Sequence, residues 1–313
     1  MIAKVIVDIA HSEVDKVFDY IATDDIRIGD RVSVPFGRHF IEGFVVGLEK
    51  SSDLPYEKLK KIGCVLDDFS AFSDETLKLA EFLRDTYHVP FALALRQFIP
   101  SELRGGKVKE KTVAIVRLAD NVSEDRISVE LKKNAIAQLA VIETLKIRKE
   151  AGYTELSDKF GAQAVRALEK KGLLTVTLEK ATRVPYGTLE SKSDDVKLTQ
   201  EQARAVYGIE TTDKQISLLF GVTGSGKTEV YLKLISDTLK SGKTAIMLVP
   251  EISLTPQMLK QLRARFCGEV SILHSRLSAG EKFDEWLRLK RGEAKIAIGA
   301  RSAVFAPLDN IGL

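Results

Sequence analysis

The sequence predicts a multidomain α/β protein in which a β-rich, barrel-like N-terminal domain is followed by a winged-helix domain and a P-loop lobe with a parallel sheet. The first 66 residues hold short apolar runs separated by turn signals, a pattern typical of β structure. Helical periodicity follows, and beyond residue 198 strand and helix signals alternate around a glycine-rich loop. A length of 313 residues also favours two or three domains.

The N-terminal domain is expected to cover residues 1–105 and to contain short strands followed by two helices. β-branched residues dominate its early apolar runs, and glycine and proline separate them. Several short strands with turn signals favour a small barrel or a curled sheet. Ser73 is a suitable N-cap for the first helix. The expected elements are strands over residues 2–9, 31–37 and 40–48, and helices over residues 73–87 and 90–98.

The second domain is expected to cover residues 110–186. After one strand the pattern becomes helical, and three helices followed by a β-hairpin are the order of a winged-helix module. Basic residues on the third helix and in the hairpin could contact phosphates, and the alternative is a packing or spacer domain with solvated charges. The basic residues are Arg166, Lys170, Lys171, Lys180 and Arg183. The expected elements are strands over residues 111–118, 173–178 and 182–184, and helices over residues 135–145, 154–160 and 162–171.

A polar, charged linker is expected over residues 187–197, and a lobe with a mainly parallel sheet over residues 198–313. In this lobe apolar strands alternate with helical stretches, which is the doubly wound α/β pattern. The expected elements are strands over residues 216–220, 244–249, 270–273 and 295–298, and a helix over residues 228–239.

Residues 221–228 match the P-loop pattern G-x-x-x-x-G-K-T in full. An apolar strand is expected to enter the loop and a helix to leave it, and the alternative is a glycine turn that only resembles a P-loop. Glycine backbones and the helix N-terminus direct N–H groups at phosphates. Lys227 and Thr228 are the expected catalytic residues, because the lysine should reach the β- and γ-phosphates of ATP and the threonine hydroxyl should bind Mg²⁺. The expected ATP-binding residues of the loop are Gly221, Val222, Thr223, Gly224, Ser225, Gly226, Lys227 and Thr228.

Composition and cysteine use exclude several protein classes. Cys64 and Cys267 have no metal-ligand spacing and form no disulfide framework, so we expect no zinc site in this chain and a reducing, cytoplasmic location. A net charge of +3 permits nucleic-acid binding without requiring it. The chain begins with no basic and apolar leader, and no apolar run approaches about 18 residues. Neither a signal peptide nor membrane contact is therefore expected.

Three segments around the P-loop carry a resemblance to a known family. Residues 198–202 read LTQEQ, residues 221–231 read GVTGSGKTEVY and residues 248–257 read LVPEISLTPQ. They are similar to the adenine-reading segment and the first two helicase motifs of the PriA (primosomal protein N′) family, bacterial replication-restart DNA helicases of superfamily 2. The resemblance implies that Gln202 reads the adenine base and that the lobe is the first, incomplete RecA-like lobe of a motor.

A fourth segment, residues 299–307 (GARSAVFAP), resembles the strand-contacting motif of the same family. The resemblance implies that Arg301 and Ser302 contact DNA, and a planar guanidinium after a strand suits a phosphate. Ala300 stands where the family usually has threonine, which removes one hydroxyl contact. Trp286, taken as an isolated feature, is expected to be structural.

The N-terminal domain resembles the 3′-end-binding domain of this family through residues 18–20 (FDY) and 34–37 (VPFG). The resemblance implies a pocket for the terminal nucleotide of a 3′ strand. An aromatic ring can stack on the base, and a carboxylate can accept a hydrogen bond from the 3′-hydroxyl. Without the resemblance the same side chains would be core, turn and solvated residues. The DNA-binding residues so implied are Phe18, Asp19, Gly37 and Lys60.

The resemblance further implies an ATP-dependent, 3′-to-5′ DNA helicase that recognises stalled or abandoned replication forks and initiates primosome assembly. The implied cofactors are ATP and Mg²⁺. The implied partners are forked DNA with a 3′ end, primosome proteins, single-stranded-DNA-binding protein and the replicative helicase loader, all in the cytoplasm at the nucleoid. Residues 229–313 hold no acidic pair after an apolar strand. We therefore expect the N-terminal part of a longer helicase, inactive alone, with the acidic motif, the second lobe and a zinc-binding insertion beyond it.

Two other functions are compatible with a P-loop. A small-molecule kinase with accessory domains would need a lid and an acceptor pocket, to which the proline-bracketed residues 250–256 are poorly suited. A DNA-binding adaptor with a vestigial P-loop is the other, although the intact Lys227 and Thr228 argue against decay. Stimulation of ATPase activity by nucleic acid would separate a motor from a kinase.

Overall fold

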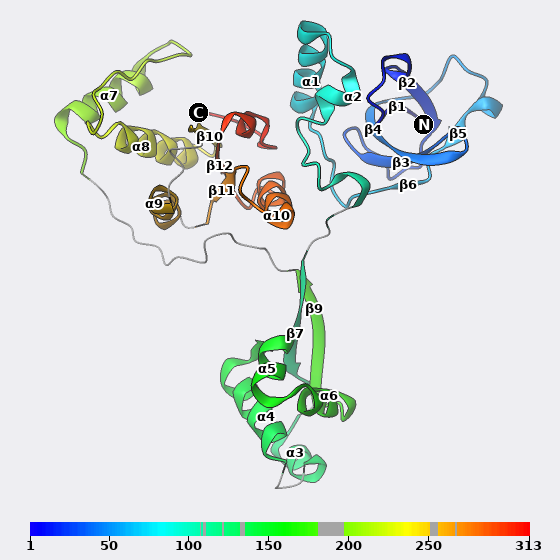
Figure 1. The fold of residues 1–313 in the computed structure, drawn as a ribbon, viewed down its shortest axis with the longest axis vertical. Helices are drawn as coiled ribbons and strands as arrows, with labels where there is room; N and C mark the ends of the chain where they lie inside the picture. The colour runs from blue at the N-terminus through cyan, green and yellow to red at the C-terminus, as the bar shows by residue number, and fades with distance from the viewer. Residues whose placement is uncertain are drawn as a thin grey trace. The chain divides into compact units, whose positions relative to one another are not determined.

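The computed structural model describes residues 1–313 except residues 107, 109, 110, 121, 132–134, 181–196, 251–255 and 267. The chain divides into two compact units: the first is Met1–Val108 together with Val184–Leu313, and the second is Lys109–Arg183. Figure 1 traces the elements of both units. Among the described residues, no helix combines the length and apolar character that a bilayer span requires.

The N-terminal part of the first unit begins with a curled, largely antiparallel sheet. Its elements are β1 (Ile2–Val7), η1 (Ser12–Val14), β2 (Val17–Ile21), β3 (Arg31–Phe36), β4 (His39–Glu49), η2 (Tyr56–Lys58), β5 (Lys60–Lys61) and β6 (Cys64–Val65). The strand order is β5-β2-β1-β4-β3-β6, and the strands expected over residues 2–9, 31–37 and 40–48 are confirmed. The segment that forms β5 and β6 pairs first with β2 and then with β3, so one short stretch of chain contacts both edges of the sheet.

Two helices, α1 (Asp74–Tyr87) and α2 (Phe91–Leu95), pack beside this sheet and are followed by η3 (Arg104–Gly106). α1 begins at the expected N-cap, because the Ser73 hydroxyl accepts a hydrogen bond from the backbone N–H of Thr76. α2 is fixed at its first residue by Asp15, whose carboxylate accepts from the Phe91 N–H at 2.7 Å. Both helix predictions are therefore confirmed, with α2 shorter than expected.

The same unit contains the elements of the P-loop lobe. They are α7 (Gln200–Thr211), α8 (Lys227–Lys240), β10 (Ala245–Leu248), α9 (Pro256–Phe266), β11 (Val270–Leu273), α10 (Ala279–Lys290), β12 (Ile296–Gly299) and η5 (Arg301–Phe305). The sheet order is β10-β12-β11 with parallel neighbours, so the carboxyl ends of these strands lie at one edge. The strands expected over residues 244–249, 270–273 and 295–298 and the helix over residues 228–239 are confirmed.

The prediction of a strand over residues 216–220 is wrong. These residues adopt no regular structure, and the side chains of Ile216, Leu218 and Phe220 are 90%, 89% and 92% exposed. A strand needs a neighbour that takes up its backbone N–H and C=O groups. No strand in the described part of the chain pairs with this segment, so three of its four apolar side chains are left in solvent.

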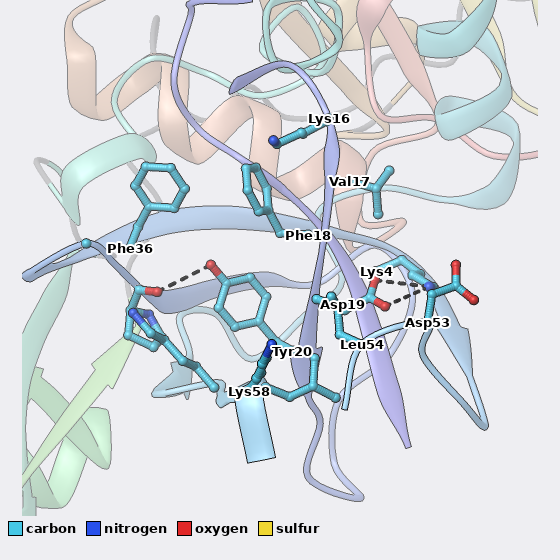
Figure 2. Close-up of a pocket in the computed structure, with 14 residues that line it drawn as sticks. Lys4, Lys16, Val17, Phe18, Asp19, Tyr20, Phe36, Asp53, Leu54 and Lys58 are labelled. Carbon is cyan, nitrogen blue, oxygen red and sulfur yellow. Dashed lines mark hydrogen bonds and ion pairs between the residues drawn. The ribbon is translucent and has the colours of Figure 1, made fainter. Parts of the chain in front are cut away.

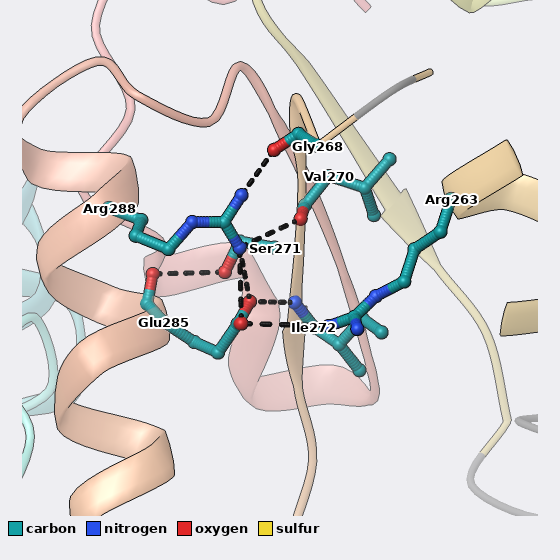
Figure 3. Close-up of polar contacts among 7 residues, drawn as sticks. All are labelled: Arg263, Gly268, Val270, Ser271, Ile272, Glu285 and Arg288. Carbon is teal, nitrogen blue, oxygen red and sulfur yellow. Dashed lines mark hydrogen bonds and ion pairs between the residues drawn. The ribbon is translucent and has the colours of Figure 1, made fainter. Parts of the chain in front are cut away.

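A buried ionic cluster joins the helices and sheet of the lobe. Glu285 on α10 is fully buried, and its carboxylate accepts from the backbone N–H of Ile272 on β11 at 2.8 Å. Arg288 Nη1 lies 3.1 Å from the Glu285 Oε1 atom, and Arg263 Nη2 on α9 lies 3.6 Å from the same atom. Figure 3 shows this carboxylate between the two guanidinium groups. One acidic side chain thus connects α9, α10 and β11.

A shared core also connects the N-terminal part of this unit with the lobe. Trp286 on α10 is 5% exposed, and its indole N–H donates to the Phe98 carbonyl at 2.9 Å. The ring of Phe98 lies edge-on to that of Phe305, with centroids 5.2 Å apart. Trp286 is therefore structural, as expected for this tryptophan taken as an isolated feature.

The second unit contains the strands β7 (Thr112–Leu118), β8 (Glu150–Gly152) and β9 (Leu174–Lys180), and the helices α3 (Glu124–Glu130), α4 (Ile136–Arg148), α5 (Tyr153–Phe160) and α6 (Ala162–Lys170). The helices expected over residues 135–145, 154–160 and 162–171 are confirmed, whereas α3 was not expected. β9 pairs along its whole length with β7, which lies between β8 and β9 in the sheet. The expected return strand over residues 182–184, with Arg183, lies outside the described residues, as does most of the expected linker.

Candidate functional site: a pocket at the edge of the N-terminal sheet and a P-loop

The first candidate site is a pocket of about 680 Å³ beside β2 in the N-terminal sheet. β5 pairs with β2 only at Tyr20 and Ile21, so Val17 to Asp19 have no strand partner on that side among the described residues. Side chains from both faces of the strand can therefore reach one cavity. Figure 2 shows the pocket. The lining residues are Lys4, Lys16, Val17, Phe18, Asp19, Tyr20, Pro35, Phe36, Gly37, Asp53, Leu54, Lys58, Leu59 and Lys60.

Aromatic side chains form one wall of the pocket. Phe18 and Phe36 are partly buried, and their rings meet edge-on with centroids 5.4 Å apart. The Lys16 ammonium lies 5.5 Å from the centroid of the Phe18 ring. The buried Tyr20 hydroxyl donates to the Pro35 carbonyl at 3.3 Å, and burial raises the pKa of this phenol. Each ring has a flat apolar face of the kind on which a nucleic-acid base stacks.

Asp19 is the most firmly held acid of the pocket. Its carboxylate oxygens each lie 3.0 Å from the Lys4 ammonium, and the Ser52 hydroxyl donates to Oδ2 at 2.5 Å. Lys4 also lies 3.1 Å from Glu49 Oε2, and the hydrogen bonds to Asp19 and then to Glu49 raise the pKa of the Lys4 ammonium. Figure 2 shows Asp19 beside Lys4, away from the aromatic wall. The acid is thus fixed in one orientation.

The pocket carries more positive than negative charge. Four lysines line it against two aspartates, which gives a balance of +2. Three of the lysines, Lys16, Lys58 and Lys60, form no ion pair with any described carboxylate. A balance of this sign suits a phosphate-bearing ligand.

Gly37 occupies the turn between β3 and β4, where only Gly37 and Arg38 separate the paired residues Phe36 and His39. Its φ is +61°, and a Cβ atom placed on it would meet nothing within 4 Å. A positive φ at the first position of a two-residue hairpin turn favours glycine. The open space beside it allows a ligand to approach the backbone closely.

The second candidate site is the P-loop, which ends where α8 begins. Gly224 and Gly226 have φ angles of +83° and +80°, and these conformations favour glycine. The Lys227 ammonium turns back into the loop and donates to the carbonyls of Gly221 and Val222 at 2.6 and 2.9 Å. Thr228 is exposed in the first helical turn. The loop therefore places an ammonium, a hydroxyl and a helix N-terminus together, which fits a nucleotide polyphosphate with its cation.

Gln202 contacts the P-loop from α7. Its side-chain oxygen accepts from the Thr199 N–H at 2.9 Å, and its amide nitrogen lies 3.4 Å from the carbonyl oxygens of Ser225 and Gly226. A Cβ atom on Gly226 would lie 2.3 Å from this nitrogen, so a larger residue there would displace the Gln202 amide from this contact. Gln202 therefore lies against the P-loop and also caps α7.

Arg301 and Ser302 lie in η5, directly beyond the carboxyl end of β12. Both side chains are exposed at the edge of the sheet where ligands bind in folds of this kind. The neighbouring segment after β10, residues 251–255, lies outside the described residues.

The structure brings together all four residues that were expected to form the 3′-end pocket: Phe18, Asp19, Gly37 and Lys60 line one cavity. Sequence reasoning missed Lys4 and Ser52. Lys4 is the only charged residue in β1, and it lies directly opposite Asp19 in the register of β1 and β2. A single lysine in an apolar strand was the available signal. Ser52 gave no such signal, because a loop serine is ordinary.

Two protein families match separate parts of the chain. The family described as 3'DNA-binding domain (3'BD) matches residues 4–100, which include the whole pocket. The family described as DEAD/DEAH box helicase matches residues 199–311, which include the P-loop and η5.

Bacterial relatives match nearly the whole chain. It is 32% identical to the replication restart protein PriA of Bacillus subtilis, across 99% of this chain and 48% of the relative. It is also 32% identical to the Haemophilus influenzae protein of the same name, across 95% of this chain and 42% of the relative. A Treponema pallidum relative with that name is 43% identical over 39% of this chain. The chain spans about half the length, or less, of these relatives.

Proposed function

Because the chain belongs to the PriA family of replication restart proteins, whose N-terminal portion it matches, we propose that it supplies the DNA-end-binding and nucleotide-binding parts of an ATP-dependent DNA helicase. The helicase is of superfamily 2 and moves 3′ to 5′. It recognises stalled or abandoned replication forks that carry a 3′ end. It then initiates primosome assembly, with single-stranded-DNA-binding protein and the replicative helicase loader as partners, in the cytoplasm at the nucleoid.

The pocket around Asp19 is the observation that carries this proposal. A terminal nucleotide has a flat base, a phosphate on its 5′ side and a free 3′-hydroxyl. Phe18 provides a surface for the base, Lys60 and its neighbouring lysines attract the phosphate, and Asp19 accepts from the hydroxyl. Gly37 lets the sugar approach the backbone. Each part of the nucleotide thus has a counterpart in the cavity.

The P-loop supports ATP as the energy source. Lys227 would leave the loop carbonyls to bind the β- and γ-phosphates, Thr228 would bind Mg²⁺, and Gln202 would contact the adenine. ATP hydrolysis supplies the energy for movement along DNA. Arg301 and Ser302, exposed at the same edge of the sheet as the other carboxyl strand ends, would contact the phosphates of the translocated strand.

We propose the following domain folds for the chain. Residues 1–105 form a barrel-like end-binding domain, residues 110–186 a winged-helix domain, residues 187–197 a linker, and residues 198–313 a RecA-like lobe. The hydrogen bonds from the chain around β5 and β6 to both sheet edges support the barrel. In the second unit, three successive helices and a strand support the winged helix, and Arg166 and Lys170 on α6 are exposed. We propose that this face contacts duplex DNA.

The test is binding of the chain to forked DNA whose leading strand ends in a 3′-hydroxyl or in a 3′-phosphate, at one salt concentration. We expect preference for the hydroxyl end, and we expect Asp19→Ala to abolish the preference. Asp53→Ala is the matched control, because it removes an exposed carboxylate from the same pocket. Equal binding of both ends by the wild-type chain would contradict the proposal.

A further inference from the structure

Two hydrogen bonds and one ion-pair contact hold the Asp19 carboxylate and leave acceptor capacity open on Oδ1. A carboxylate has about four lone-pair positions on its two oxygens. Oδ2 accepts hydrogen bonds from the Lys4 ammonium and from the Ser52 hydroxyl, whereas Oδ1 has only an ion-pair contact with Lys4, at 3.0 Å. The Asp19 side chain is 13% exposed. One position on Oδ1 is therefore available to a ligand in the pocket.

Lys4 does not resemble the other lysines of the pocket. Its ammonium lies between two carboxylates, 3.0 Å from Asp19 and 3.1 Å from Glu49, so this group of three carries a net charge of −1. The backbone pairing shifts register between Lys4 and Val5, and this bulge lies beside the pocket strand. A phosphate near Lys4 would also meet two negative charges. The Lys4 ammonium is therefore already paired with Asp19, whereas the Lys60 ammonium remains available to bind a phosphate.

Ser52 connects Asp19 to the rim of the pocket. Its hydroxyl oxygen accepts from the Leu54 N–H at 3.1 Å and directs its single proton at Asp19. The same turn places Asp53 and Leu54 on the pocket wall. The orientation of the acid and the position of the rim are thus set by one serine.

We propose that Lys4 and Ser52 are positioning residues that aim Oδ1 of Asp19 at the 3′-hydroxyl and make the pocket selective for a hydroxyl over a phosphate end. The proposal rests on the function proposed above. The negative cluster of Lys4, Asp19 and Glu49 repels a terminal phosphate. The remaining lysines attract the phosphate on the 5′ side of the same nucleotide. The cavity thus has a negative group at Asp19 and positively charged lysines elsewhere along its lining.

The experiment uses the 313-residue chain and a fluorescent fork whose leading strand ends in a 3′-hydroxyl, a 3′-hydrogen or a 3′-phosphate. Anisotropy gives the Kd for each end at several salt concentrations. For Ser52→Ala and Lys4→Met we expect about tenfold weaker binding of the hydroxyl end and unchanged binding of the hydrogen end, as the loss of one charge-assisted hydrogen bond predicts. Lys4→Met should also bind the phosphate end no more tightly than the wild type does.

Lys60→Met is the matched control. It should weaken binding of all three ends alike. It should also reduce the slope of log K against log salt concentration by about 0.7, which is the contribution of one phosphate contact to a single strand. Lys4→Met and Ser52→Ala should leave that slope unchanged. If Lys4→Met behaves like Lys60→Met, Lys4 is a phosphate ligand and the proposal is wrong for it. Ser52→Ala removes only one hydroxyl, so its result remains interpretable if Lys4→Met unfolds.

Two outcomes distinguish the positioning role of Lys4 and Ser52 from DNA-end binding by the pocket. Loss of the hydroxyl preference in Asp19→Asn, with the preference kept in both Lys4→Met and Ser52→Ala, would overturn the positioning role and leave the end-binding function standing. No preference in the wild-type chain would overturn both.

Discussion

A methyl group added at Gly37 tests the pocket more directly than any charge change. The φ of +61° costs an alanine about 1–2 kcal/mol, and its Cβ would enter open space rather than touch the protein. In a compact unit of about 240 residues this strain lowers the melting temperature by about 2–4 °C per kcal/mol. With a nucleotide bound, the same methyl occupies ligand space. Overpacking of this kind costs about 1–3 kcal/mol, or about fivefold to hundredfold in Kd.

Gly242 provides the matched control for this variant. Its φ is +77°, and a Cβ there also meets nothing within 4 Å, but it lies after α8, outside the pocket. Gly242→Ala should show a similar loss of stability by thermal denaturation. It should bind a 3′-hydroxyl fork as the wild type does, whereas Gly37→Ala should bind it weakly in the anisotropy assay. If both variants bind the fork equally well, the nucleotide does not lie against Gly37 and our description of the pocket is wrong.

Three further predictions concern the lobe and the charge on Lys4. Lys227→Ala should weaken binding of a fluorescent ATP analogue about tenfold or more in a titration, because a charge-assisted phosphate contact is lost; unchanged affinity would contradict the P-loop assignment. Glu285→Gln should lower the free energy of unfolding in urea by about 3–5 kcal/mol, because a buried carboxylate between two arginines is removed, while the exposed Glu293→Gln should change it by less than about 0.5 kcal/mol. The carboxylates of Asp19 and Glu49 raise the pKa of the Lys4 ammonium above 10.5. The stabilisation that this charge gives the folded state should therefore be constant at neutral pH and lost as pH rises beyond 10.5. Urea titrations at alkaline pH measure the difference in unfolding free energy between wild type and Lys4→Met, and a difference that does not change with pH would contradict this prediction.

Local patterns made the P-loop predictable from sequence. Its glycines, lysine and threonine are contiguous, and the structure places Lys227 at the start of α8, within one residue of the expected position. The β-branched run after Met1 and the Ser73 cap depend likewise on neighbouring residues, and both predictions are confirmed. The pocket residues themselves were expected only through resemblance, because strands and turns from distant parts of the chain bring them together.

Non-local pairing explains what the sequence could not provide. Lys4 becomes informative only when the register places it opposite Asp19, and a single-sequence pattern carries no register. The segment over residues 216–220 has strong strand propensity, yet strand propensity acts only where a neighbouring strand is present. In the second unit, the pairing of β9 with β7 joins residues about 60 positions apart, which no local hairpin signal indicates.

The core shared through Trp286 has a consequence for dissecting this protein into pieces. Phe283, Trp286 and Leu287 of the lobe belong to the same buried cluster as Phe98 and Leu103, although two separate families describe the two regions. A lobe expressed without the N-terminal part would therefore expose an indole and several apolar side chains and would tend to aggregate. Substitutions on either side of this junction are constrained by the other side, so recombination that exchanged one region alone would be counter-selected.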